Sequence, residues 1–63
     1  MKHGQKVRIR NCPIFSGWEG CVRANNYKGT DLILVQLDEP ARIKYPHQRD
    51  DMFTFFRSDL KVI

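Results

Sequence analysis

The feature that most limits the fold of this chain is the shortness of its regular segments. Apolar residues occur in brief runs separated by Gly, Pro, Asn and Asp, and no segment has the length and period of a helix. In KVRIR (6–10), Val7 and Ile9 alternate with basic residues, which is the period-two pattern of a half-buried strand. The sequence therefore predicts an all-β fold built from short strands.

Four more segments of the same kind follow along the chain. LILVQL (32–37) is apolar at nearly every position, and MFTFFR (52–57) is rich in β-prone aromatic residues. Strands are predicted at 6–10, 20–24, 32–37, 52–57 and 61–63, with a single short 3-10 turn at 58–60 before the last strand. Five strands in 63 residues favour one domain, 1–63, that forms a small, strongly curved barrel.

The longest connection is the charged stretch 38–51, which contains two prolines and predicts a loop. Its basic and aromatic cluster is nearly balanced by four acidic residues. The cluster comprises Arg42, Lys44, Tyr45, His47 and Arg49, and the acidic residues are Asp38, Glu39, Asp50 and Asp51. The net field is small, so a mobile surface loop is favoured over a binding site.

Catalytic and metal sites have little support in this sequence. No nucleophile stands beside a base, no glycine-rich loop could hold phosphate, and a barrel this small encloses no substrate. Cys12, Cys21, His3 and His47 lack the paired spacing of zinc ligands, so two reduced thiols are the better interpretation. We expect a non-enzyme with no cofactor, metal or small-molecule substrate.

The hydrophobic segments are also too short for a membrane. No apolar run approaches the ~20 residues that span a bilayer, and the first residues show no signal-peptide core. A cytoplasmic location with no membrane partner is the default expectation.

The motifs GQKVRI, GWEGCV, LILVQLD and FFRSDLKVI, in this order, resemble the SH3-like barrel family. Two branches of the family share the layout: the KOW-type domains of ribosomal and transcription-elongation proteins, and the small peripheral subunits of photosynthetic electron-transfer complexes. The photosynthetic subunits look similar at both ends. Their opening pattern Gly-x-Lys-Val-Arg-Ile corresponds here to Gly4, Lys6, Val7, Arg8 and Ile9. Their closing pattern Phe-x-x-x-x-Leu-x-Val corresponds to Phe56, Leu60 and Val62, with one residue fewer before Leu60. The resemblance covers most of the chain except 38–51.

In such barrels the Gly-x-x-Gly-x-Val turn leads from the first long loop into the second strand. The resemblance implies that Gly17 and Gly20 allow a sharp bend and a close approach between strands. Trp18 either caps the open end of the barrel or offers a stacking surface beside Arg23.

Nucleic-acid binding, RNA or DNA, is the first functional hypothesis, and the KOW resemblance implies it too. The net charge is +4, which favours anionic partners. The candidate residues are basic side chains on outward strand faces and aromatic side chains in the adjoining loops: Lys6, Arg8, Arg10 and Arg23, with Phe15, Trp18 and Tyr27. A solvated basic face is the alternative interpretation.

Protein docking or self-association is the second hypothesis, as an accessory subunit of a redox or photosynthetic-type complex or as a phage or bacterial regulator. If Ile33, Val35 and Leu37 face the core and Thr54 and Phe56 point inward, four residues form one exposed apolar patch: Leu32, Leu34, Phe53 and Phe55. A bulge that flips the register, or a loop folded over the patch, would remove it.

Overall fold

Alternation of apolar and polar residues produces five strands in the computed structural model, which describes residues 1–39 and 51–63. The elements are β1 (Lys6–Ile9), β2 (Glu19–Ala24), η1 (Tyr27–Gly29), β3 (Leu32–Leu37), β4 (Met52–Phe56), η2 (Arg57–Asp59) and β5 (Leu60–Val62). The strands form one antiparallel sheet, and its two helical elements are 3-10 turns of three residues each. The all-β prediction is confirmed, and each predicted strand is present close to its expected position.

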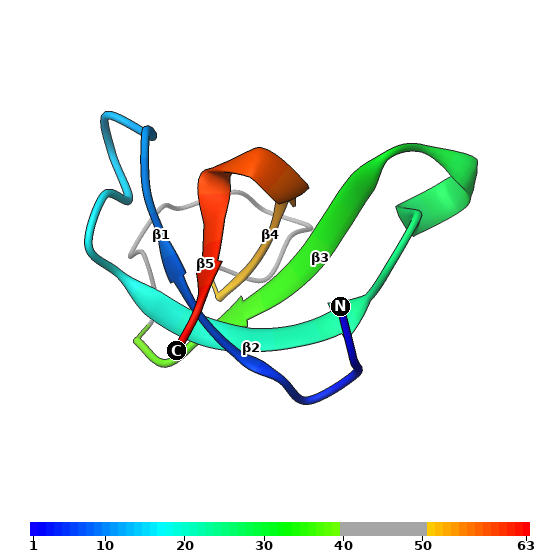
Figure 1. The fold of residues 1–63 in the computed structure, drawn as a ribbon, viewed down its shortest axis with the longest axis horizontal. Helices are drawn as coiled ribbons and strands as arrows, with labels where there is room; N and C mark the ends of the chain where they lie inside the picture. Colours follow the sequence, from blue (N-terminus) through cyan, green and yellow to red (C-terminus); the bar gives the residue numbers. More distant parts are fainter. Residues whose placement is uncertain (40–50) are drawn as a thin grey trace.

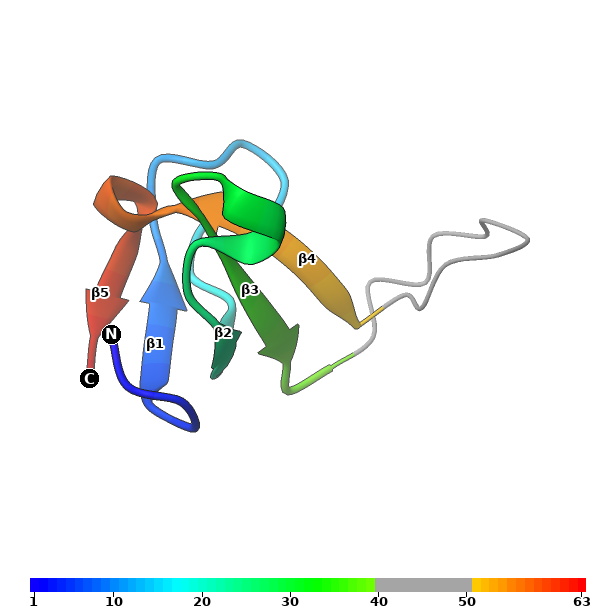
Figure 2. The ribbon, with the colours of Figure 1, turned by 90° about the vertical axis from the view of Figure 1, so that its right-hand side faces the viewer.

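The strand order in the sheet is β4-β3-β2-β1-β5. Figure 1 shows β2 curving beneath the other strands, and Figure 2 shows β5 and β4 at opposite ends of the sheet. Consecutive strands are therefore neighbours, except that β5 returns to pair with β1. Among the described residues β4 and β5 are not paired with each other, so strand pairing does not close the sheet into a barrel.

The hydrophobic core lies on the concave side of this curved sheet. Each strand contributes alternate side chains, as the period-two pattern requires. The buried residues are Val7, Ile9, Phe15, Val22, Ile33, Val35, Leu37, Phe55 and Leu60. The predicted inward positions of β1 and β3 are thus confirmed, and the opposite, outer face carries the basic side chains of β1.

Gly17 and Gly20 have the structural roles expected of them. Gly17 has φ +89°, a left-handed conformation that glycine adopts without a steric cost. Gly20 has an ordinary φ, but a β-carbon there would lie 2.4 Å from the carbonyl oxygen of Gln36. Gly17 therefore permits the bend before β2, and Gly20 permits β3 to approach β2 closely.

The predicted 3-10 turn before the last strand is present as η2 (Arg57–Asp59), but it is not the single one among the described residues, because η1 is a second. Asn26 and Lys28 both adopt left-handed conformations, with φ 48° and 52°, and tighten the chain between β2 and β3. Thr30 then closes the turn, since its backbone N–H and its hydroxyl both donate to the Tyr27 carbonyl. The connection between β2 and β3 is therefore a tight, locally hydrogen-bonded turn.

The predicted facing of β4 is also wrong. Phe55 is buried and Phe53 packs against the core, whereas Thr54 and Phe56 face outward. The reason is register: Phe55 lies opposite Ile33, and directly opposed residues of an antiparallel pair share one face. The predicted exposed patch of Leu32, Leu34, Phe53 and Phe55 therefore does not exist as such.

No helix in residues 1–39 or 51–63 is long and apolar enough to cross a membrane. The basic cluster predicted in the loop 38–51, from Arg42 to Arg49, lies outside the described residues.

Candidate nucleic-acid interface

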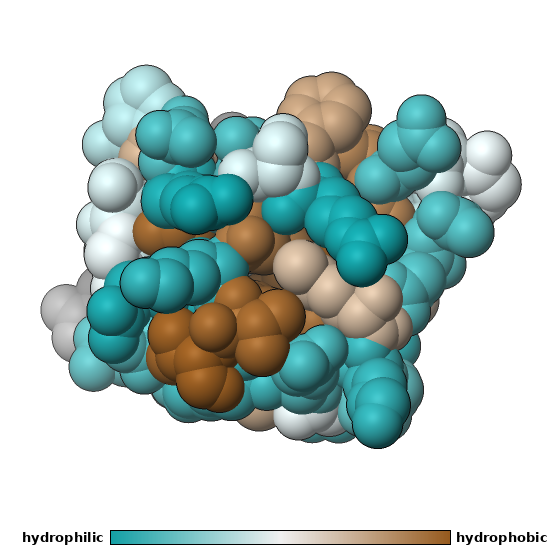
Figure 3. Space-filling view, in the orientation of Figure 1, coloured by the Kyte–Doolittle hydropathy of each residue, from teal (hydrophilic) through white to brown (hydrophobic). Residues whose placement is uncertain are grey.

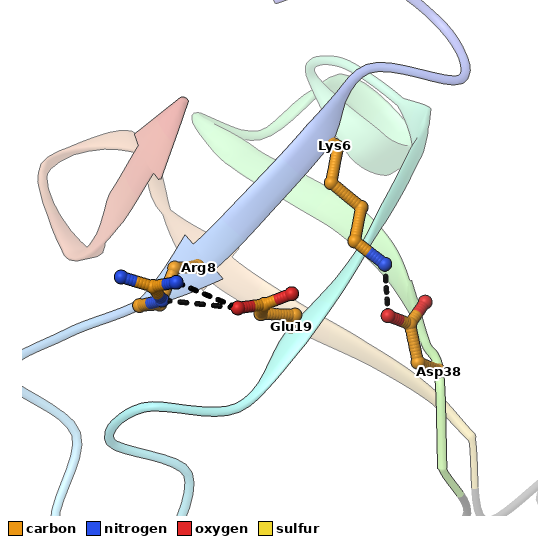
Figure 4. Close-up of polar contacts among 4 residues, drawn as sticks. All are labelled: Lys6, Arg8, Glu19 and Asp38. Atoms are coloured by element: carbon orange, nitrogen blue, oxygen red, sulfur yellow. Dashed lines mark hydrogen bonds and ion pairs between the residues drawn. The ribbon is translucent and has the colours of Figure 1, made fainter. Parts of the chain in front are cut away.

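The two basic side chains of β1, Lys6 and Arg8, point outward, and both are engaged by acidic residues of other elements (Figure 4). Arg8 donates from Nε and Nη2 to one carboxylate oxygen of Glu19, at 3.2 and 2.8 Å. Lys6 donates to the carboxylate of Asp38, which follows β3. Both predicted phosphate ligands are thus partly neutralised within the molecule.

The contact with Asp38 raises the pKa of Lys6 above its ordinary value of 10.5. The main cause is the hydrogen bond that the ammonium group donates to Asp38, and Coulomb attraction to the same carboxylate adds to it. Lys6 therefore stays charged at neutral pH, and its side chain is 39% exposed, but the carboxylate of Asp38 offsets its charge.

Arg10 and Arg23 have neutral partners instead. Arg10 Nε donates to the carbonyl oxygen of Ser58 at 3.2 Å, and Arg23 Nε donates to Gln36 Oε1 at 2.8 Å. The pairing of β2 with β3 shifts by one residue between Val22 and Ala24, so Arg23 occupies a β-bulge. Both arginine residues are exposed. Because these partners are uncharged, the contacts do not offset the positive charge of either guanidinium group.

Lys61 is a basic residue of this face that sequence reasoning missed. It lies directly opposite Arg8 in the pairing of β1 with β5, and it is exposed. Arg10 is the next outward residue after Arg8, and its backbone N–H bonds to the carbonyl of Asp59, just before β5. Arg8, Arg10 and Lys61 therefore form one group, which we call the basic strip.

Phe15 is not available for stacking on a base. Its side chain is 7% exposed and contacts three aromatic rings of the core. The ring centroids of Trp18, Phe53 and Phe55 lie 5.3, 4.9 and 5.8 Å from its own. Phe15 is therefore a core residue contributed by a loop, and its predicted role at the surface is wrong.

Trp18 is half-buried and packs against the core, which fits the capping interpretation. It also lines a cavity of about 330 Å³ together with Gly17, Glu19, Asp38 and Glu39. Three carboxylates line this cavity; Glu19 and Asp38 are paired with Arg8 and Lys6, and Glu39 adds a further negative charge, so the cavity offers phosphate no excess of positive charge. Trp18 thus faces surroundings unsuited to a nucleic-acid backbone.

Tyr27 is half-buried in η1 and lies within 5.4 Å of the Lys28 ammonium group, measured to the ring centroid. Trp18 precedes β2 and Tyr27 follows it, so the full length of this six-residue strand separates the two aromatic residues. Figure 1 shows η1 and the loop before β2 at opposite sides of the molecule. The structure does not bring the predicted aromatic residues together.

The outer face of β3 and β4 is mostly apolar, whereas the outer face of β1 and β5 is basic. Leu32 lies opposite Phe56 and Leu34 lies opposite Thr54. Phe56 is 59% exposed, and the two leucines are half-buried. The apolar surface of β4 is therefore built around Phe56, not around Phe53 and Phe55.

A second apolar region lies on another side of the molecule. Val62 and Ile63 are 48% and 47% exposed. On the face shown in Figure 3, hydrophobic side chains gather where Figure 1 places the C-terminus, with hydrophilic residues around them.

In residues 1–39 and 51–63, no three His, Cys, Asp or Glu side chains are grouped closely enough to hold a metal ion. Cys12 and Cys21 are free thiols. Comparison with known proteins gives no match to a family model, a curated protein or a solved structure.

Proposed function

We propose that this chain is a small, non-catalytic nucleic-acid-binding module that acts through the basic strip of β1 and β5. The observation that carries the proposal is the placement of Arg8 on β1 opposite Lys61 on β5, with Arg10 directly after β1, all three exposed. Of the three, only Arg8 has an acidic partner among the described residues. Lysine and arginine side chains on one face are what phosphate neutralisation requires.

The mode of binding is electrostatic rather than aromatic. Phe15 is buried and Trp18 faces an acidic cavity, so neither supports base stacking beside the strip. We infer contacts to the phosphate backbone with little sequence preference, since phosphate contacts carry no direct sequence information.

The absence of catalysis belongs to the same proposal. Among the described residues, no Ser, Thr or Cys side chain donates a hydrogen bond to a His, Asp or Glu. The hydroxyl of Thr30, for example, is used locally to close η1. No activated nucleophile of the usual kind is therefore assembled among them.

We also propose that the curved sheet is a partly open barrel of the SH3-like type. The strand order, the 3-10 turn between β4 and β5, and the return of β5 to β1 support this assignment. In this arrangement the edges of β4 and β5 stay unpaired with each other.

The test is an anisotropy titration of labelled single- and double-stranded oligonucleotides, at about 50 and about 200 mM salt. We expect wild-type binding to weaken steeply with salt. Arg10→Glu with Lys61→Glu should reduce affinity at least about tenfold and lower the salt slope by about 1.4 for single strands, at ~0.7 per lost contact.

The matched control is Lys2→Glu with Lys28→Glu, which changes the net charge equally at exposed positions outside the strip. This control should lose clearly less affinity than the strip variant. Equal losses in the two variants would show that net charge alone drives binding. No binding at the lower salt would remove the proposal.

A further inference from the structure

One edge of β4 has backbone groups that pair with no other strand among residues 1–39 and 51–63. The N–H of Leu37 donates to the carbonyl of Asp51 at 2.7 Å, which sets the phase of the β3–β4 ladder. Because antiparallel partners exchange bonds at alternate residues, Phe53 and Phe55 bond to β3. The N–H groups of Met52, Thr54 and Phe56 therefore point away from it, and no other described strand pairs with them.

This edge lacks the features that usually prevent pairing with another chain. Edge strands are commonly short, charged, bulged or interrupted by proline. β5 fits that description, because it has three residues and carries Lys61. β4 has five residues, MFTFF, all uncharged, and its pairing with β3 is regular.

The sequence of β4 is complementary to that of a second copy of the same strand placed beside it in the antiparallel direction. A register centred on Thr54 opposes Met52 to Phe56 and Phe53 to Phe55, and it brings the ends that carry Asp51 and Arg57 near each other. The opposed side chains within the strand are all apolar, and the residues that flank the strand, Asp51 and Arg57, have opposite charges. In a parallel arrangement, by contrast, Asp51 would meet Asp51 of the second copy. The strand therefore favours an antiparallel copy of itself as its partner.

We propose that two copies of this chain associate through β4, with a two-fold axis at Thr54, to join their five-stranded sheets into one continuous sheet. Thr54 of each copy exchanges two backbone hydrogen bonds with Thr54 of the other. The N–H of Phe56 donates to the carbonyl of Met52 of the second copy, and the reverse bond follows by symmetry.

The side chains of the outer face support the same pairing. Phe56 is 59% exposed in the single chain, and the proposed register covers it with Met52 of the second copy. A thioether against an aromatic ring is a favourable contact. Leu32 and Leu34 lie beside Phe56 and Thr54 on β3, so the apolar halves of the two copies become continuous.

The proposed interface is formed by the edge of β4, and no residue of the basic strip belongs to that strand. Arg10 lies near the end of β4, because its Nε donates to the carbonyl of Ser58, but this contact is with η2 and not with the edge N–H groups of β4. The dimer and the nucleic-acid proposal can therefore fail independently.

The test uses charges at the two-fold axis, and sedimentation velocity over a wide range of protein concentration is the measurement. Thr54→Lys and Thr54→Glu each place like charges directly opposite each other. Each should raise the dimer dissociation constant about fivefold or more. An equal mixture of the two variants should restore dimers, because the introduced lysine of one chain faces the introduced glutamate of the other only if the register is centred on this position. Thr54 is exposed, so circular dichroism should show both variants folded.

Ser16→Lys, at another exposed position that is not part of a strand, is the control and should dimerise like the wild type. Amide hydrogen exchange gives a second readout: protection of Thr54 should rise with concentration, while that of Phe55 should not. A wild-type chain that stays monomeric, or forms assemblies larger than dimers, overturns the proposal. Dimers that both single variants retain, or a mixture that does not recover, overturn it as well.

Discussion

Gly20 sets the distance between β2 and β3. A β-carbon at this position would lie 2.4 Å from the Gln36 carbonyl oxygen and 2.8 Å from Cγ1 of Val35. Neither contact can be relieved by rotating a flexible side chain end, because one partner is backbone and the other belongs to a fully buried valine. The requirement for glycine here is therefore spatial, whereas at Gly17 it is conformational.

Gly20→Ala should lower the free energy of unfolding by about 3 kcal/mol, the upper range for overpacking a dense core. Gly17→Ala should cost about 1–2 kcal/mol, because nothing lies within 4 Å but φ is +89°. Urea unfolding, followed by the fluorescence of Trp18, measures both.

Ser16→Ala, at an exposed neighbouring position, is the control and should stay within about 0.5 kcal/mol of the wild type. If Gly20→Ala were as stable as the wild type, the close approach of β3 would be wrong. If Gly17→Ala lost more stability than Gly20→Ala, the left-handed backbone conformation at Gly17 would matter more than the close approach of the strands at Gly20.

At the scale of elements, Phe15 shows how a loop completes the core of a small sheet. It lies outside every strand, yet it is buried against Trp18, Phe53 and Phe55. Phe15→Leu should lower the free energy of unfolding by about 1–2 kcal/mol through lost aromatic contacts. It should leave the affinity for single-stranded oligonucleotides within about twofold, far below the effect of about 1–3 kcal/mol expected of a stacking residue.

Tyr27→Leu is the matched control, since this aromatic residue lies outside the core cluster. Its stability loss should be smaller than that of Phe15→Leu in the same urea titration. A Phe15→Leu variant with unchanged stability and weakened binding would return Phe15 to the nucleic-acid surface.

The positions of the strands could be predicted from the sequence, but the facing of β4 could not. In β1, polar and apolar residues alternate, so Val7 and Ile9 had to face inward. β4 is apolar on both faces, and its facing depends on pairing with β3, where Ile33 meets Phe55. A shift of one residue would exchange the two faces. Local periodicity contains no information about that register.

The basic strip was predictable only in part, for the same reason. Alternation places Arg8 and Arg10 on the outer face, but Lys61 joins them only because β5 pairs with β1. The acidic partners of Lys6 and Arg8 come from other elements, at Asp38 and Glu19. Contacts between residues distant in sequence decided which of the predicted charges are paired.

At the scale of the whole molecule, charge and hydrophobicity are separated along one sheet. The basic strip lies on β1 and β5, the apolar outer face lies on β3 and β4, and the acidic cavity lies beside Trp18. A net charge of +4 therefore understates the local field at the strip. Position should matter more than the total charge in attracting a polyanion.

Glu19 and Glu39 allow this idea to be tested with two variants of equal net charge. Either glutamate-to-glutamine change takes the net charge from +4 to +5. Both residues line the acidic cavity, but only Glu19 holds a guanidinium group of the strip, at 2.8 Å from Arg8 Nη2. Glu19→Gln should release Arg8 for phosphate and raise the affinity for single-stranded oligonucleotides several-fold. The salt slope should steepen by about 0.7, which corresponds to one additional phosphate contact.

Glu39→Gln should raise the affinity less than about twofold and leave the salt slope unchanged, because it only alters the distant field. Anisotropy titrations of both variants at several salt concentrations measure the two quantities together. Stability should change by less than about 1 kcal/mol in Glu19→Gln, since the broken ion pair is partly exposed. Equal gains in the two variants would mean that the oligonucleotide responds to the total charge. An unchanged or weaker affinity in Glu19→Gln alone would mean that Arg8 does not contact phosphate.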